Sequence, residues 1–241
     1  MIRVGIGGWT FAPWRGVFYP DKLAQARELE YAGQHLTSIE INGTFYGAQK
    51  PESFRKWSAE TPDGFVFSVK GTRFATNRKV LAEAGPSIER FCNGGVRELS
   101  KKLGPILWQM APFKKFEPDD FDAFLALLPK DLRHVVEVRH ESFLAPEFAA
   151  LCRKHKVAIA AVESDKHPLI DEVTADFTYA RLQKTQEDIA TGYSKADLRK
   201  IAERARKWAA NGKRDVFIYM ISGAKVRAPA AAMALIAELD K

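Results

Sequence analysis

The sequence alternates between short runs of β-branched or aromatic residues and longer segments in which apolar residues recur at helical spacing. The predicted strands are residues 2–8, 38–42, 65–70, 104–110, 134–139, 157–163, 177–182 and 215–221. The predicted helices are residues 21–33, 51–60, 86–102, 118–128, 146–155, 194–210 and 228–239. This alternation predicts parallel strands joined by right-handed crossovers, which is the α/β class.

Eight strands in a chain of 241 residues favour a closed barrel over an open doubly wound sheet. Gly5, Gly7 and Gly8 do not form the GxGxxG turn that a nucleotide-binding sheet needs. Residues 164–176, between the sixth and seventh strands, have no clear helical pattern, so one helical crossover is expected to be poorly formed. Because no linker or repeat divides the chain, we predict a single (β/α)8 TIM-type barrel domain over residues 1–241.

The composition is that of a globular protein, with 46% hydrophobic and 28% charged residues, and it excludes disorder and coiled coil as the main state. Cys92 and Cys152 form neither a CxxC pair nor a zinc-ligand spacing, so we expect a reducing compartment. The N-terminus lacks the pattern of a signal peptide, and no apolar run approaches the ~20 residues of a membrane span. These features predict a cytoplasmic protein without a membrane partner and leave its oligomeric state open.

The net charge of +7 comes from one part of the chain. Between Arg181 and Arg227 there are twelve basic and five acidic residues, whereas the remainder is balanced. A basic surface attracts polyanions, so nucleic-acid binding through residues 181–227 is one hypothesis for the function. A basic outer face is equally typical of any solvated helix.

Polar residues recur at the ends of the predicted strands. In a parallel barrel the loops that follow the strands surround one mouth, where catalytic groups gather. Side chains two residues apart on a strand share a face, which predicts the ones that point into the barrel. The expected inward pairs are Glu40 with Asn42, Ser68 with Lys70, Leu107 with Gln109, Glu137 with Arg139 and Tyr179 with Arg181, and Glu163 is expected to end the sixth strand at the same mouth.

Charged side chains inside a barrel need partners, water or a ligand. The carboxylates and cations predicted at the mouth balance, which fits a structural ionic layer. Alternatively, Lys70, Arg139 and Arg181 hold an anionic group, because guanidinium groups suit carboxylates and phosphates. Glu40 and Glu137 would then transfer protons, in the manner of an inverting carboxylate pair.

Two less favoured hypotheses concern the same residues. Lys70 qualifies as a Schiff-base amine if neighbouring cations lower its pKa. His140, together with Glu40, Glu137 and Glu163, is a candidate ligand set for a divalent metal, although no HxH or HExxH pattern accompanies it. No other cofactor is predicted.

Aromatic residues are frequent in the loops after the first and second strands. A long loop buries apolar side chains to stay ordered, which accounts for most of them. We expect Trp9 and Tyr46 to line the mouth, where aromatic rings offer a face to a planar or sugar-like ligand.

Four segments occur in an order that is similar to a known family. They are GIGGWTFAPWRGVFYP, SIEINGTFYGAQKPESFRKWSAETPDGFVFSVKG, LGPILWQMAP and VVEVRHESF. Together they resemble the DUF72 (YecE-like) family over nearly the whole chain. The resemblance implies a TIM-type barrel and no assigned biochemical activity. The polar mouth positions that it implies are Glu40, Asn42, Tyr46, Lys70, Gln109, Glu137, Arg139, His140 and Arg181.

The sequence departs from the family pattern in three places that follow strands. A Thr-His pair reads Thr76-Asn77, an RxHG segment reads Arg181-Leu182-Gln183-Lys184, and a paired Asn reads Ser222-Gly223. The two missing histidines fit either a different activity or a non-catalytic scaffold.

The leading hypothesis is an enzyme that acts on a small polar, anionic metabolite by hydrolase, lyase or isomerase chemistry, without a nucleotide cofactor. The expected catalytic residues are Glu40, Glu137 and Lys70, and the expected substrate-binding residues are Trp9, Asn42, Tyr46, Gln109, Arg139, His140 and Arg181.

Overall fold

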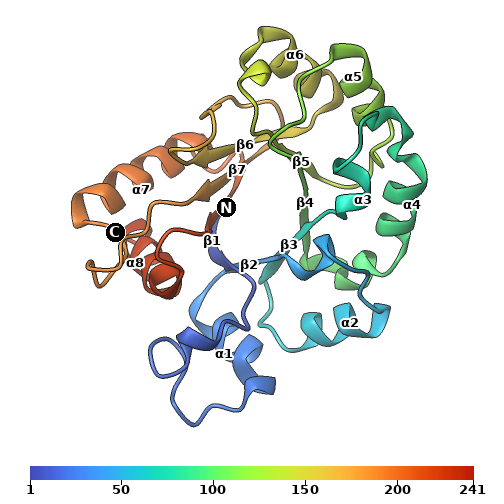
Figure 1. Ribbon diagram of the computed structural model, residues 1–241. Helices are drawn as coiled ribbons and strands as arrows, with labels where there is room; N and C mark the ends of the chain where they lie inside the picture. The colour runs from blue at the N-terminus through green and yellow to red at the C-terminus, as the bar shows by residue number, and fades with distance from the viewer.

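The computed structural model describes residues 1–241, and its eight strands form a closed barrel (Figure 1). The strands are β1 (Ile2–Gly7), β2 (Ser38–Ile41), β3 (Val66–Lys70), β4 (Leu103–Gln109), β5 (His134–Glu137), β6 (Ala158–Glu163), β7 (Phe177–Leu182) and β8 (Asp215–Met220). Each strand pairs in parallel with the next, and β1 pairs with β8 to close the ring. The predicted (β/α)8 barrel and its eight strands are confirmed.

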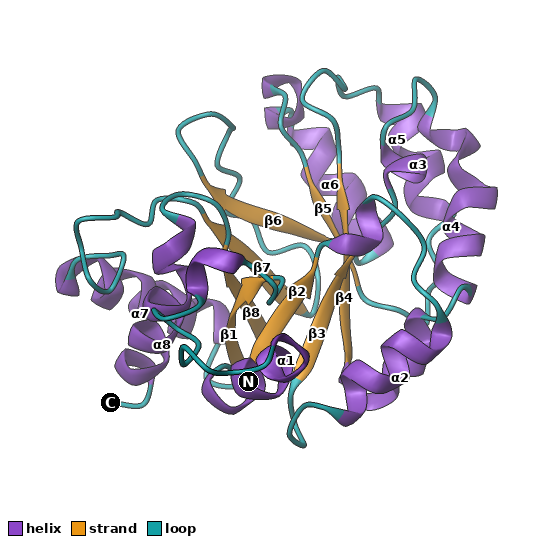
Figure 2. Ribbon diagram, turned by 60° about the horizontal axis from the view of Figure 1, so that its bottom comes forward, coloured by secondary structure: helices purple, strands orange, loops and turns teal.

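The helices surround the strands (Figure 2). They are α1 (Glu28–His35), α2 (Pro51–Ala59), α3 (Arg73–Thr76), α4 (Gly85–Asn93), α5 (Pro118–Ala126), α6 (Pro146–His155), α7 (Lys195–Ala209) and α8 (Ala228–Leu239). Short 3-10 helices occupy Ala12–Trp14, Gln25–Arg27, Gly43–Phe45, Leu81–Ala84, Val96–Lys102, Glu141–Leu144 and Lys225–Arg227. Residues 164–176 contain no helix, as predicted. None of the helices has the length and apolar character that crossing a membrane requires.

The predicted and observed helices differ in three places. The helix predicted from residue 21 begins only at Glu28, because Ala24 has extended backbone angles and a 3-10 turn follows it. The helix predicted over 86–102 ends at Asn93, because Gly95 adopts a φ of 121° through which a helix does not continue. The four-residue α3 was not predicted, since so short a segment carries no periodic signal.

The interior of the barrel is filled by the inward side chains of alternate strand positions. Leu107 and Phe217 belong to this inner cluster, as does Tyr219. The Tyr219 hydroxyl lies 2.6 Å from the Ser38 hydroxyl and 2.7 Å from that of Ser68, so the polar atoms of this layer bind one another. The next inward residues on β2 and β3 carry charges. This layer is therefore the last uncharged layer of the interior before the mouth.

Candidate functional site at the barrel mouth

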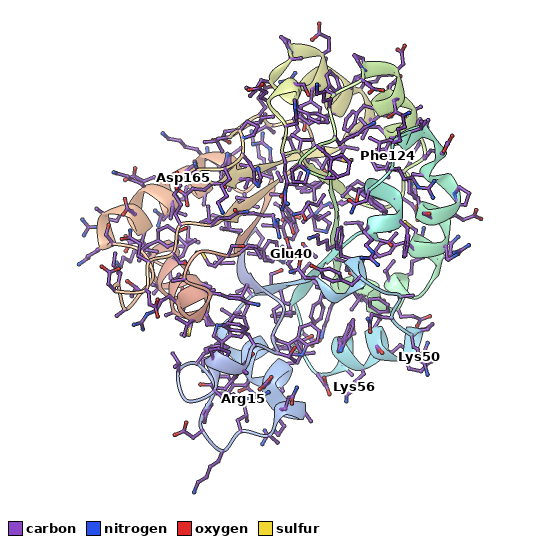
Figure 3. All side chains as sticks on the ribbon, in the orientation of Figure 1. Arg15, Glu40, Lys50, Lys56, Phe124 and Asp165 are labelled. Atoms are coloured by element: carbon purple, nitrogen blue, oxygen red, sulfur yellow. The ribbon has the colours of Figure 1, made fainter.

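One guanidinium lies at the centre of the mouth. Arg181, on β7, donates from Nη2 to Oε1 of Glu40 at 2.9 Å and from Nε to Oε2 of the same carboxylate at 3.1 Å. Its Nη1 donates to Oε2 of Glu137 on β5. Glu40 lies near the centre of the ring of strands in Figure 3. Arg181 is 3% exposed, so this two-sided ion pair ties together three strands that are not neighbours.

The two carboxylates have further partners. The Tyr179 hydroxyl donates to Oε2 of Glu40 at 2.5 Å. Oε1 of Glu137 accepts from the Gln109 amide at 2.8 Å and from Nε of Arg139 at 2.9 Å. Both carboxylates are fully buried, so each oxygen is bound inside the protein. The two carboxylates are thus paired inside the protein, as the hypothesis of a structural ionic layer expects.

The electrostatics of Glu137 agree with this geometry. Burial raises the pKa of Glu137, but the Arg181 and Arg139 guanidiniums outweigh it and the Gln109 amide adds to them. The net effect lowers the pKa of Glu137 to about 2. Glu137 is therefore ionised at neutral pH and is a poor proton acceptor.

Lys70 is the exception among the buried charges of the mouth. Its ammonium group makes no hydrogen bond or ion pair with the protein, and it lies 4.2 Å from the centroid of the Phe45 ring. Burial, followed by repulsion from Arg181, lowers the pKa of Lys70 to about 8. The mouth thus holds one buried, unpaired amine that changes charge near neutral pH.

A cavity of about 780 Å³ opens onto this cluster. Its charged lining consists of Lys70, Arg139, Lys166, Arg181, Lys184 and Lys225, with Asp165 as the one acidic member. Asp165, on the loop after β6 (Figure 3), pairs with Lys184 at 2.6 Å. Even when the buried Glu40 and Glu137 are included, basic side chains outnumber acidic ones around the cavity. This surplus favours an anionic occupant.

The structure brings most of the predicted site residues to this cavity. Those that line it are Asn42, Tyr46, Lys70, Gln109, Arg139 and Arg181. Glu40 and Glu137 lie fully buried and bound to Arg181. Trp9 lines a smaller neighbouring cavity instead. His140 lines neither cavity, because its Nδ1 accepts the Ser142 backbone N–H at 3.1 Å and begins the following turn.

The expectation that Glu163 faces the mouth is wrong. On β6 the inward positions are Ala158, Ala160 and Val162, so the next residue points to the outside of the barrel. There the Tyr193 hydroxyl donates to Glu163 at 3.0 Å.

The metal-ligand set suggested by the sequence does not form. Glu163 points away from the mouth, and His140 caps its own turn. Glu40 and Glu137 are held by Arg181. No group of three or more His, Cys, Asp or Glu side chains is arranged to hold a metal ion.

Several cavity residues were not singled out from the sequence. Ser164, Asp165, Lys166 and His167 come from the irregular loop after β6, and Lys225 comes from the loop after β8. The only indication in the sequence that these loop residues reach the cavity was the lack of a helical pattern over 164–176. A crossover without a helix leaves its residues free to fold over the mouth. Two of the three departures from the family pattern also lie here, because Gln183, Ser222 and Gly223 line the cavity.

The basic segment 181–227 does not form one surface. Arg181 is buried in the barrel, and Lys225 lines the mouth cavity. On the outside, Arg206, Arg214 and Arg227 donate to backbone carbonyls of the protein. Some of the surplus basic residues therefore lie at the barrel mouth, and others bind backbone carbonyls on the outside of the protein.

A closed (β/α)8 barrel with an ion-paired cluster and a basic cavity at the carboxyl ends of its strands defines a TIM-type barrel protein with a charged mouth. Residues 3–241 match the family described as "Protein of unknown function DUF72". The chain belongs to this family, which confirms the resemblance seen in the sequence.

Individual relatives agree with this assignment. The chain is 29% identical over 154 residues to the UPF0759 protein YecE of Escherichia coli strain K12, an alignment that covers 60% of this chain and 51% of that protein. It is 27% identical over 156 residues to the UPF0759 protein YunF of Bacillus subtilis, covering 61% and 54%. The matched segment thus spans about half the length of these curated relatives. A crystal structure of a DUF72 family protein from Thermotoga maritima superposes with a TM-score of 0.83, at 22% identity and with 100% of both chains covered, which shows the same fold.

Proposed function

We propose that this protein is an enzyme that binds a small anionic metabolite in the mouth cavity and uses the Lys70 amine as its acid–base group. The observation that carries the proposal is the unpaired Lys70 amine in a cavity whose other charges are mostly basic. The reaction is a proton transfer of the isomerase, lyase or hydrolase type, because a group with a pKa near neutrality both accepts and donates a proton.

Arg139 is the main candidate for holding the anion. Glu137 accepts a hydrogen bond from its Nε, which fixes the side chain, whereas its terminal nitrogens make no hydrogen bond. Lys166 and Lys225 also lack carboxylate partners. A positioned guanidinium with a free end suits a carboxylate or a phosphate.

We propose for Glu40 and Glu137 a different role from the one expected from the sequence. Each of their oxygens accepts at least one hydrogen bond from a protein donor, and neither carboxylate has exposed surface. We assign them to holding Arg181 and Arg139 in place. Proton transfer is assigned to Lys70, whose amine has no competing partner.

The test measures anion binding and turnover in matched variants. Inorganic phosphate and acetate are titrated into the wild type, Arg139→Gln, Lys70→Met and Lys207→Met, the last being an exposed lysine on α7 outside both cavities. We expect Arg139→Gln to weaken binding about tenfold, equivalent to about 1.4 kcal/mol, and Lys207→Met to leave it unchanged. Circular dichroism confirms that each variant is folded.

Turnover is then followed by NMR with a set of carboxylated and phosphorylated metabolites. Lys70→Met should abolish consumption of any compound that the wild type converts. Equal turnover by Lys70→Met would overturn the catalytic assignment, and anion binding without any turnover would favour the scaffold hypothesis. RNA binding that is lost with the basic residues of α7, with no anion in the mouth, would favour the nucleic-acid hypothesis.

A further inference from the structure

A second cavity of about 310 Å³ adjoins the mouth cavity. The two share Gly7, Trp14, Asn42 and Lys225 in their linings. The remaining lining comes from the loop after β1, the end of β2 with the loop that follows it, and helix α2. We call it the side cavity.

Aromatic rings form much of the wall of the side cavity. Trp9 meets Trp57 of α2 edge to face, with ring centroids 5.2 Å apart, and Phe11 meets Trp14 in the same way at 5.3 Å. Trp9 and Trp57 are both partly exposed, so they offer surface to an occupant. No acidic side chain lines the side cavity.

The polar groups of the side cavity are free. The Thr10 hydroxyl and the Gln49 amide line it, and neither makes a hydrogen bond with the protein. The Asn42 amide nitrogen donates to the Glu40 backbone carbonyl at 3.2 Å, which leaves its oxygen without a donor. Cavities that bind small molecules combine apolar walls with a few polar groups that fix orientation.

Lys225 stands at the boundary of the two cavities. Its ammonium lies 4.2 Å from the Phe11 ring centroid and has no carboxylate partner. The Trp14 indole donates to the Lys225 backbone carbonyl at 2.8 Å, which ties the loop after β8 to the loop after β1. One cation is thus available to a ligand that extends from the mouth into the side cavity.

We propose that the side cavity binds a hydroxyl-bearing, sugar-like ring whose attached anionic group occupies the mouth cavity. The inference deepens the proposed function, on which it rests, by naming the substrate class as anionic sugars. A plain aromatic ring would pack against Trp9 and Trp57 but would form no hydrogen bonds with the Thr10 hydroxyl or the Gln49 amide. A ring with hydroxyl groups satisfies both the aromatic wall and the free polar groups.

The experiment compares ligands with and without a sugar ring. Glucose 6-phosphate, ribose 5-phosphate and glucuronate are titrated against inorganic phosphate, acetate and phenyl phosphate. At least one sugar anion should bind about tenfold more tightly than the matching simple anion and than phenyl phosphate. Trp9→Ala and Gln49→Ala should each remove most of this advantage without changing the affinity for inorganic phosphate.

The matched control is Phe113→Ala, because Phe113 is 74% exposed and lines neither cavity. Gln49→Ala guards against a folding defect in the tryptophan variant. Sugar anions that bind no better than phosphate or phenyl phosphate overturn the inference, while Arg139-dependent phosphate binding still supports the proposed function. If none of these anions binds, both proposals fall.

Discussion

Arg181 binds Glu40 through two hydrogen bonds of 2.9 and 3.1 Å, although the two residues are 141 positions apart in the chain. The same guanidinium also binds Glu137. Arg139 supplies a second cation to Glu137, so two carboxylates and two guanidiniums, each costly to bury alone, are paired in one cluster that joins β2, β5 and β7. The hydrogen bonds of the cluster fix its side chains at the base of the cavity. The side chains that line the cavity next to it therefore have little conformational freedom.

Removal of Arg181 is expected to destabilise the fold strongly. Arg181→Met leaves two buried carboxylates without their main partner, and we expect a loss of about 3–5 kcal/mol in the free energy of unfolding, measured by urea denaturation at pH 7. The control is Arg97→Met, which breaks the exposed ion pair with Asp131 and should cost less than about 1 kcal/mol. Similar losses in the two variants would contradict the structural role of the cluster.

The stability of the protein should fall in acid because of Glu137. Its pKa is lowered to about 2 in the folded state, so its contribution is present above its unfolded pKa and is lost as the pH falls through the folded one. Below about pH 4.5 and down to about pH 2, Glu137 should account for roughly 3 kcal/mol of the decline. Denaturant midpoints measured across this window should show a shallower acid slope for Glu137→Gln than for the wild type. Parallel slopes would show that other carboxylates control the acid limb.

The sequence predicted which strand positions point to the mouth where regular pleating continues to the end of the strand. Lys70 and Gln109, the last residues of β3 and β4, follow the period of two and reach the cavity. The prediction that Glu163 faces the mouth is wrong because Glu163 follows the last inward position of β6 and points to the outside of the barrel. His140 lines neither cavity, because it lies beyond β5, where the chain has begun a turn.

The partners of the mouth charges could not be derived from the pattern. Which cation meets Glu40 depends on the relative register of β2 and β7, which are separated by two other strands. Balanced numbers of charges therefore could not reveal that Arg181 takes both carboxylates and leaves Lys70 unpaired. The loop over 164–176 was equally inaccessible, because irregular backbone carries no periodic signal for the placement of Asp165 or His167.

A close contact between β1 and β2 gives a prediction about the barrel itself. A methyl group at Gly5 would overlap the backbone carbonyl oxygen of Ser38 on the neighbouring strand. Gly5→Ala should therefore disrupt the pairing of β1 with β2 and lower the thermal midpoint by well over 5 °C, or prevent soluble expression. Gly47→Ala is the control, since an added methyl group there meets nothing within 4 Å. A normal melting curve for Gly5→Ala would show that the strands separate at little cost.

We expect the Lys70 amine to lower the stability of the folded protein, as a residue that is retained for function would do. Its pKa falls from 10.5 to about 8 on folding, so the unfolded chain binds more protons between these values and stability rises with pH across that range. At pH 7 the charged amine opposes folding, and Lys70→Met should increase the free energy of unfolding by about 1–3 kcal/mol. The gain should shrink above pH 8 and be absent above about pH 10.5, whereas Lys207→Met should show no such dependence.

Urea denaturation at pH 7, 8.5 and 10 measures this difference directly. A structural member of the ionic layer would show the reverse, because its removal would leave a buried carboxylate unpaired and lower the stability at pH 7. Lys70 has no carboxylate to leave behind, whereas Arg181 has two. A loss of stability in Lys70→Met would therefore show that Lys70 is a structural member of the ionic layer. The proposed active site would then have no acid–base group.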